Sequence, residues 1–225
     1  MAAYSLPLTQ GQFTVTGRAL SFIKAYQLPT VTGINSITLR MSSRNAISAS
    51  PFTYAQQVIA HQGQRWEADV NLPTMKNDKA RTWLAWFAKL DGNLNVFTMG
   101  DPANATPQGS AGGTPLVAGA DQTGKYLNID GCTASQTGWL KAGDYIQIGS
   151  GAKARLHMVT EDTSSDGSGN VTLSLWPEIR TAYADNASII TSSPVGAFRL
   201  AGSVSTWSVD ESSFYGISFS AIGVV

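Results

Sequence analysis

One stretch of the chain, residues 65–101, constrains the fold more than any other. At its start, apolar side chains alternate with charged and polar ones, which is the period of a strand that buries one face. The apolar set is Trp66, Ala68, Val70 and Leu72, and the polar set is Arg65, Glu67, Asp69 and Asn71. We therefore predict a half-buried strand over residues 65–72.

Farther along the same stretch the period changes to that of a helix. Pro73 opens the segment and Gly92 follows it as a stop signal. The apolar side chains at helical spacing are Ala80, Trp83, Leu84, Phe87 and Leu90. Burying four large side chains of this stripe would contribute roughly 1.5–3 kcal/mol each. We predict one amphipathic helix that braces a sheet, and then a short strand that ends at Gly100.

The charge of the chain is low, which limits the functions open to it. Only 13% of the 225 residues are charged, against about 25% in ordinary soluble proteins, and the formal net charge is +0. A neutral surface does not attract the phosphates of nucleic acid, and it favours association with other protein surfaces. We therefore expect a subunit of a larger assembly that does not bind nucleic acid directly.

Targeting signals and disulfides are not visible in the sequence. Cys132 is the only cysteine, so no disulfide forms within the chain. The first ten residues, MAAYSLPLTQ, lack the basic and apolar segments of a secretion signal. No apolar run approaches the ~20 residues that cross a bilayer. We expect neither a signal peptide nor a membrane-spanning segment.

The N-terminal third has strand-like alternation on both sides of a polar segment. Ile37, Leu39 and Met41 alternate with polar residues and predict one strand, and residues 54–61 predict another. Residues 42–51 are interpreted as a polar connection. We predict a hairpin turn at residues 61–64 that leads into the Trp66 strand.

The middle of the chain has a different character. Twelve of the 22 glycines lie between Gly109 and Gly169, and helical spacing disappears there. Short apolar runs recur between turn signals at residues 116–118, 126–129, 145–148, 156–159 and 171–175. This pattern predicts a small, nearly closed β-barrel of about five strands. Its clearest hairpin joins residues 156–161 to residues 170–176 through a Gly-rich loop.

The C-terminal residues return to the alternation of the first third. Phe198 and Leu200 alternate, residues 204–209 are strand-like, and residues 215–219 again place apolar side chains at every second position. These strands need partners, and the closest in style are residues 37–41 and 66–72. We predict a discontinuous domain of residues 1–101 and 196–225, with residues 102–195 inserted as the β-barrel module. The alternative is two consecutive domains, with the last strands in the barrel.

Two segments imitate ligand-binding loops but depart from them at decisive positions. Residues 119–126 have the glycines and lysine of a phosphate-binding loop, yet Tyr126 replaces the small hydroxyl and the segment continues as a strand. Residues 162–167 have the oxygens and glycine of a calcium loop, yet Leu173 replaces the bidentate glutamate. We interpret both as hairpin loops and expect no metal and no cofactor, with a loosely bound ion left open at the second loop.

The histidines, serines and carboxylates of this sequence do not match the spacing of a catalytic site. His61 and His157 lack the spacing of a zinc site, and no Gly-x-Ser-x-Gly elbow occurs, so we interpret both as surface or turn histidines. The carboxylate pairs considered for sugar cleavage are Glu161 with Asp162 and Glu67 with Asp69. The first pair points to opposite faces of a strand, and the second lies on a polar strand face rather than in a cleft. We expect no catalytic residues and no enzymatic activity.

Aromatic side chains of the inserted segment offer a binding role. Small β-barrels stack sugars or bases on such rings, and the candidates are Trp139, Tyr145 and Trp176. Apolar neighbours such as Leu140 and Leu175 favour core packing for the same rings. A carbohydrate-binding module that contacts host surface glycans through these three residues therefore stands as the alternative to a purely structural role.

A series of short phrases along the chain resembles a known family. They are SPFT at residues 50–53, HQG at 61–63, RWEA at 65–68, LPTM at 72–75, FTMGDP at 97–102, GTPLV at 113–117, LKAGDYI at 140–146, LWPEIR at 175–180, FRL at 198–200 and YGISF at 215–219. Their order and spacing resemble the distal tail proteins of long-tailed (siphovirus-type) bacteriophages and prophages, over nearly all of the chain after about residue 30.

The resemblance implies a mainly β fold: a tail-tube-like β-sandwich with one bracing α-helix, plus a peripheral module that is an oligonucleotide-binding-like barrel or a galectin-like sandwich. It implies a ring, commonly of six subunits, that joins the tail tube protein to the tail hub protein and anchors tail fibres or receptor-binding proteins. Such a protein is assembled in the host cytoplasm and resides in the tail tip of the virion, where DNA passes through the ring channel. The resemblance carries over no catalytic residues.

Overall fold

The computed structural model describes residues 23–203, 205–210 and 213–224. The described chain is mainly β, with one α-helix, α1 (Asn77–Leu90), and two short 3-10 helices, η1 (Pro102–Asn104) and η2 (Gly151–Lys153). The strands are β1 (Ala25–Gln27), β2 (Ser36–Ser42), β3 (Asn45–Ala49), β4 (Gln56–Ala60), β5 (Arg65–Asn71), β6 (Met75–Lys76), β7 (Val96–Met99), β8 (Gly113–Val117), β9 (Gly124–Cys132), β10 (Tyr145–Ile148), β11 (Arg155–Val159), β12 (Val171–Ile179), β13 (Ile189–Ile190), β14 (Gly196–Leu200), β15 (Trp207–Val209) and β16 (Phe214–Gly223).

An eight-stranded sheet joins the two ends of the described chain. Its order is β1-β7-β14-β16-β5-β2, and β15 and β6 pair with other parts of β16. In the register of β16 with β5, Phe219 lies opposite Val70 and Ala221 lies opposite Ala68. The predicted pairing of the C-terminal strand with residues 66–72 is therefore confirmed. The division of the chain at residues 102 and 196 into two domains stays a prediction.

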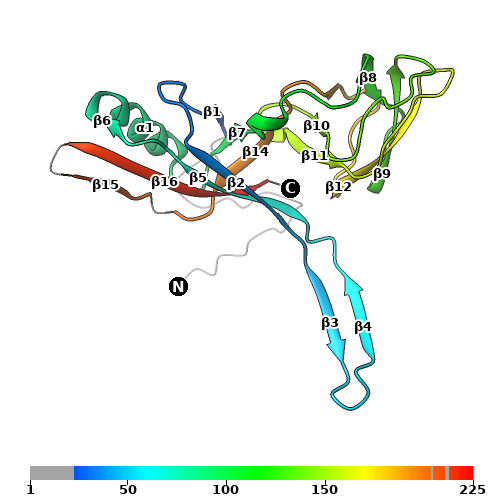
Figure 1. The fold of residues 1–225 in the computed structure, drawn as a ribbon, viewed down its shortest axis with the longest axis horizontal. Helices are drawn as coiled ribbons and strands as arrows, with labels where there is room; N and C mark the ends of the chain where they lie inside the picture. The colour runs from blue at the N-terminus through cyan, green and yellow to red at the C-terminus, as the bar shows by residue number, and fades with distance from the viewer. Residues whose placement is uncertain (1–22, 204, 211–212, 225) are drawn as a thin grey trace, which may run out of the picture.

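Helix α1 lies against this sheet (Figure 1), and aromatic rings make the contact. The ring of Trp86 lies 5.1 Å from that of Phe97 in β7 and 5.8 Å from that of Phe219 in β16, measured between centroids. The buried side chains of α1 are Ala80, Trp83, Trp86, Phe87 and Leu90. The predicted stripe named Leu84 in place of Trp86, which is wrong, because Leu84 is only partly buried.

The start of the helix also differs from the prediction that placed it near Pro73. Met75 and Lys76 instead pair with Tyr215 and Phe214 of β16, and α1 begins only at Asn77. The helix ends as predicted, just before Gly92: Asp91 adopts the left-handed conformation with φ 52°, and its N–H donates to the carbonyl oxygen of Ala88.

The second sheet has six strands and is a nearly closed barrel. Its order is β13-β10-β11-β12-β9-β8, and a bridge between Leu116 and Ser188 brings the first and last strands together. The predicted hairpin of β11 with β12 is confirmed, with Val159 opposite Leu175. The predicted count of about five strands missed the short strand β13. The barrel core includes Leu127, Ile129, Trp139, Leu140, Ile146, Ile148, Leu173 and Leu175, all 0–1% exposed.

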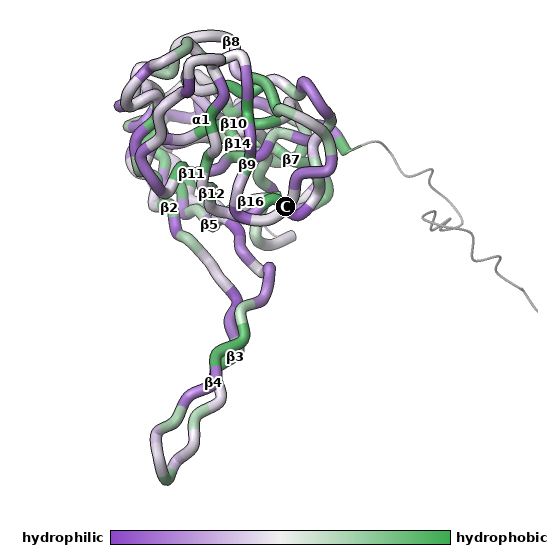
Figure 2. Tube along the Cα trace, turned by 90° about the vertical axis from the view of Figure 1, so that its right-hand side faces the viewer, coloured by the Kyte–Doolittle hydropathy of each residue, from purple (hydrophilic) through white to green (hydrophobic). Residues whose placement is uncertain are grey.

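A two-stranded hairpin, β3–β4, extends away from both sheets (Figures 1 and 2). Its strands continue β2 and β5, so residues 36–71 form one long antiparallel ribbon. Two predictions were wrong here. Residues 45–49 are a strand and not part of a polar connection, and residues 61–64 pass along the ribbon, where the N–H of His61 donates to the carbonyl oxygen of Arg44. The hairpin turn lies instead at residues 50–55.

Candidate functional site

The most prominent surface feature of the chain is this projecting hairpin, residues 45–60, which we call the arm. Every residue of β3 and β4 is exposed. The apolar side chains on it are Ile47 (66% exposed), Phe52 (91%), Tyr54 (82%), Val58 (58%) and Ile59 (52%). A monomeric protein rarely presents so many apolar side chains together unless they form an interaction surface.

The arm also lacks the features that usually protect an exposed strand edge. Residues 45–60 contain no Asp, Glu, Lys or Arg. Natural edge strands carry charges, bulges or prolines that discourage pairing with another chain. The only proline here, Pro51, lies in the turn, outside both strands. The arm therefore combines exposed apolar side chains with unprotected strand edges, which is typical of an interaction surface.

The tip of the arm is ordered by its own hydrogen bonds. The N–H of Ser50 donates to the carbonyl oxygen of Ala55, and the N–H of Tyr54 donates to that of Ser50, at 2.9 Å each. The hydroxyl oxygen of Ser50 accepts from the N–H groups of Phe52 and Thr53. These contacts hold the rings of Phe52 and Tyr54 on a defined turn.

The three aromatic residues predicted as a ligand platform do not form one surface. Trp139 is 0% exposed in the barrel core, and its Nε1 donates to the carbonyl oxygen of Gly112 at 2.8 Å. Tyr145 and Trp176 are partly buried and pack on Trp66, with ring centroids at 5.7 and 4.6 Å from its own. The structure therefore separates Trp139 from the other two, whose rings line the junction between the barrel and the eight-stranded sheet.

The two histidines differ, and one prediction was wrong. His61 is exposed at the base of the arm, as predicted. His157 is 4% exposed, because β11 is covered on both faces and period two no longer separates buried from exposed positions. Its Nδ1 lies 2.7 Å from the carbonyl oxygen of Pro177, which can only accept, so Nδ1 carries the proton. Its Nε2 then accepts from the Tyr183 hydroxyl at 3.0 Å.

Burial sets the protonation of this pair. Removal from water lowers the pKa of His157 to about 4 and raises the pKa of Tyr183 to about 12. Both groups are therefore neutral at pH 7, and the pair serves as a fixed hydrogen-bonded contact between β11 and the segment after β12.

The carboxylates considered for catalysis make structural contacts. Glu67 accepts from the guanidinium of Arg65, and this hydrogen bond holds the pKa of its carboxyl below the usual range. Asp69 accepts from the hydroxyl of Ser220 and from the guanidinium of Arg40, and both bonds lower the pKa of its carboxyl. Each carboxylate is thus engaged with side chains of the sheet surface.

The loop segments that imitate ligand-binding motifs are turns. Residues 119–123 lead directly into β9, which begins at Gly124, with no helix. In the second loop the Asp166 carboxylate accepts from the N–H groups of Ser168 and Asn170 and from the Asn170 amide, which lowers the pKa of Asp166. Within the described residues, no group of three or more His, Cys, Asp or Glu side chains could hold a metal ion.

One buried carboxylate was missed by the sequence reasoning. Asp144 is 3% exposed and follows Gly143 at the start of β10. Its oxygens accept from the N–H groups of Gln108 (2.7 Å), Gly109 (3.0 Å) and Lys141 (2.8 Å). This carboxylate connects the segment before β8 to the loop before β10. The sequence feature that could have indicated it is the Gly143-Asp144 pair between two apolar runs.

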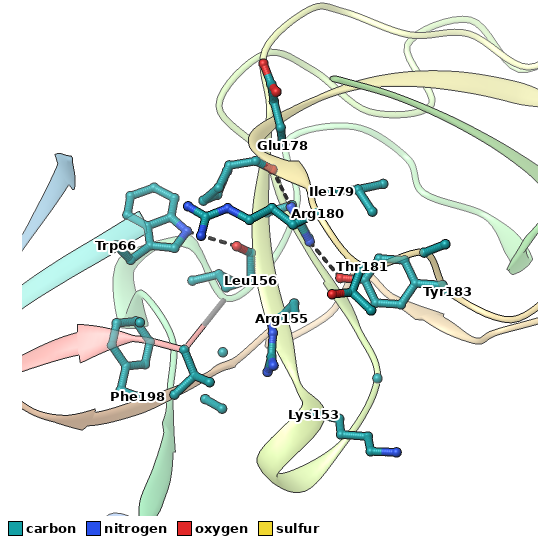
Figure 3. Close-up of a pocket in the computed structure, with 18 of the residues that line it drawn as sticks. Trp66, Lys153, Arg155, Leu156, Glu178, Ile179, Arg180, Thr181, Tyr183 and Phe198 are labelled. Carbon is teal, nitrogen blue, oxygen red and sulfur yellow. Dashed lines mark hydrogen bonds between the residues drawn. The ribbon is translucent and has the colours of Figure 1, made fainter. Parts of the chain in front are cut away.

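A cavity of about 480 Å³ lies between the barrel and the eight-stranded sheet (Figure 3). One wall comes from β11 and the chain around residues 177–184, and the other from β14, Trp66 and the end of β16. The paired rings of His157 and Tyr183 belong to the first wall. We call this space the junction cavity.

Comparison with known proteins adds no identification. No protein-family model matches this chain, and the comparison with curated proteins finds no match. Of the helices in the described residues, none has the length and apolar character needed to cross a membrane.

Proposed function

We propose that this protein is a structural subunit of the tail tip of a long-tailed bacteriophage, where six copies form a ring around the tail channel. The ring joins the tail tube protein to the tail hub protein and anchors tail fibres or receptor-binding proteins. The chain is assembled in the host cytoplasm and works in the virion. The order of short sequence phrases shared with distal tail proteins supports this function.

The observation that carries the proposal is the arm. Its residues 45–60 are uncharged, and its side chains Phe52 and Tyr54 are 91% and 82% exposed. A two-stranded hairpin on its own is at best marginally stable in water, so the arm gains stability when a partner covers it. A neighbouring subunit of a ring is the partner that the proposal names.

A closed ring needs two different surfaces on each subunit, because its contacts run head to tail. The arm supplies one of them. The edge strand β15 offers a second, since Trp207 and Val209 are 50% and 51% exposed and Phe214 nearby is 37% exposed. In Figure 1 this edge lies on another side of the eight-stranded sheet from the arm.

The two sheets receive different roles in this proposal. The eight-stranded sheet with α1 is the tail-tube-like β-sandwich and its brace, which together build the ring. The barrel is the oligonucleotide-binding-like module that projects outward to dock neighbouring tail components. The burial of Trp139 and the packing of Trp176 on Trp66 favour this docking role over a glycan platform.

The test is the oligomeric state of the purified full-length chain. Light scattering after size exclusion, with negative-stain images of the same sample, should give hexamers with an open centre. The double variant Phe52→Ser/Tyr54→Ser should remain folded by circular dichroism but become monomeric. The control Tyr126→Ser removes an aromatic side chain that is 57% exposed on the barrel, and it should still form rings.

Two results would contradict the proposal. One is a native chain that stays monomeric up to hundreds of micromolar. The other is a ring that assembles equally well without the two aromatic side chains of the arm.

A further inference from the structure

The junction cavity holds a guanidinium with no carboxylate partner in the described residues. Arg155, on β11, is half-buried and lines the cavity. Its Nη1 donates to the carbonyl oxygens of Ala152 and Ala154, at 3.1 Å each. Its Nε and Nη2 have no acceptor among the described residues. These two nitrogens form the side of the guanidinium fork that binds a carboxylate or phosphate through parallel hydrogen bonds.

The surroundings of Arg155 add positive charge and do not balance it. Lys153, which is exposed, also lines the cavity (Figure 3). Burial lowers the pKa of Arg155 and the nearby charge of Arg199 lowers it further, while Tyr183 acts in the opposite direction. None of the ion pairs of the described residues includes these three side chains. Lys153 is exposed and Arg199 is partly buried, so the cost of an unpaired charge falls mainly on the half-buried Arg155, because a charge withdrawn from water is normally paired.

The single acidic side chain of the cavity lining does not supply that balance. Glu178 extends away from the other labelled residues in Figure 3. Its backbone N–H donates to the side-chain oxygen of Gln64, and Arg180 donates to the carbonyl oxygen of the same residue. These two contacts bind the edge of the cavity to the base of the ribbon, and among the described residues no carboxylate forms an ion pair with Arg155.

Most of the remaining cavity surface is apolar, beside the polar side chains of His157, Arg180, Thr181 and Tyr183. Its lining includes Trp66, Leu156, Pro177, Ile179, Phe198 and Val224. The volume of about 480 Å³ falls within the usual range for small-molecule sites. An apolar wall beside an unpaired guanidinium matches a molecule that has an acidic head and an apolar body.

We infer that the junction cavity is a binding site for an amphipathic organic anion. The carboxylate or phosphate head lies against Nε and Nη2 of Arg155, the exposed Lys153 adds positive charge at the rim, and the apolar body lies along Leu156 and Phe198. The inference goes beyond the ring function and does not depend on it, because the cavity is formed within one chain.

Calorimetric titration of the full chain with octanoate, octyl phosphate and 1-octanol tests the site. At least one of the two anions should bind, and 1-octanol, with the same apolar body and no charge, should bind at least about tenfold more weakly. Arg155→Met should lower the affinity for the bound anion at least about tenfold, and Lys153→Met should lower it by less. The control Arg81→Met changes an exposed arginine of α1 and should have no effect.

A second readout follows anion binding to the native chain by NMR. The indole N–H resonance of Trp66, identified by its loss in Trp66→Phe, should shift when the anion is added, and that of the exposed Trp207 should not. Failure of both anions to bind the native chain would overturn the inference. So would equal affinity of the anion for the native chain and for folded Arg155→Met, or an unmoved Trp66 resonance at saturation.

Discussion

The indole Nε1 of Trp66, in β5, donates a hydrogen bond of 2.9 Å to the carbonyl oxygen of Leu156, in β11. This bond joins the eight-stranded sheet to the barrel across 90 residues of sequence. The same indole lies 4.6 Å from the ring of Trp176, nearly perpendicular to it. A single side chain thus connects the two sheets by both polar and aromatic contact.

Replacing Trp66 by Phe should weaken this connection. The variant loses the hydrogen bond, leaves the buried carbonyl of Leu156 without its side-chain donor, and reduces the aromatic contact. We expect a loss of roughly 1–3 kcal/mol in the free energy of unfolding, measured by urea denaturation. The matched control is Trp207→Phe, at a site that is 50% exposed in the monomer, and it should change stability little at a protein concentration low enough to keep the chain monomeric. Equal stability of the two variants would contradict the role given to Trp66.

Stability should fall on acidification because of His157. Its pKa is about 4 in the folded chain, against an ordinary value of 6.5. Between these two pH values the unfolded chain binds more protons than the folded one, so stability is complete above pH 6.5 and declines as the pH falls to about 4. The expected loss is roughly 2–4 kcal/mol, measured by urea denaturation at pH 7 and at pH 4.5.

The variant His157→Gln isolates this contribution. Glutamine retains a donor and an acceptor but does not titrate, so the variant should be less sensitive to pH over the same window even if it is less stable at pH 7. An identical pH dependence in the native chain and in His157→Gln would assign the acid sensitivity to other groups.

Removing the arm should leave the rest of the fold intact. Arg44 and His61 already face each other, with the His61 N–H 3.1 Å from the carbonyl oxygen of Arg44, so residues 45–60 can be replaced by an Asn-Gly turn. Because the arm residues are exposed, the free energy of unfolding of the monomer should change by less than about 1 kcal/mol. Circular dichroism and urea denaturation at low protein concentration provide the measurement. A shortened chain that fails to fold would show that the arm supports the sheet.

The carboxylate of Asp144 should contribute strongly to stability, because it holds the segment that leads into the barrel. In Asp144→Ala, the N–H groups of Gln108, Gly109 and Lys141 lose their acceptor in a buried place. We expect a loss of roughly 2–4 kcal/mol, measured by thermal and urea unfolding. Asp162→Ala serves as comparison. Among the described residues that carboxylate accepts from one backbone N–H, that of Ala142, at an exposed position, so its loss should cost far less.

Periodicity was a good guide wherever one face of an element meets a core and the other meets water. The alternation over residues 65–72 predicted β5, and Trp66, Ala68 and Val70 are buried as expected. The same argument identified the C-terminal strand and its partner. The hairpin of β11 and β12 followed from its Gly-rich loop between two apolar runs.

Periodicity failed where burial depends on a partner from far along the chain. Trp86 is buried on α1 because the rings of Phe97 and Phe219 pack against it. Its indole N–H also donates to the carbonyl oxygen of Gln27. His157 is buried because both faces of β11 are covered. Arg155 and the junction cavity could not be predicted, since their surroundings come from separate strands.

The sequence by itself determined the local repeats: which segments alternate, which one turns as a helix, and where glycine ends an element. These follow from the geometry of the backbone and from the side chains of near neighbours. Only the tertiary structure decided that the arm extends away from both sheets and that a half-buried guanidinium faces a largely apolar cavity. The reason is physical. Burial and charge pairing depend on contacts between segments that are distant in the chain, and the local sequence pattern does not specify which distant segments come into contact.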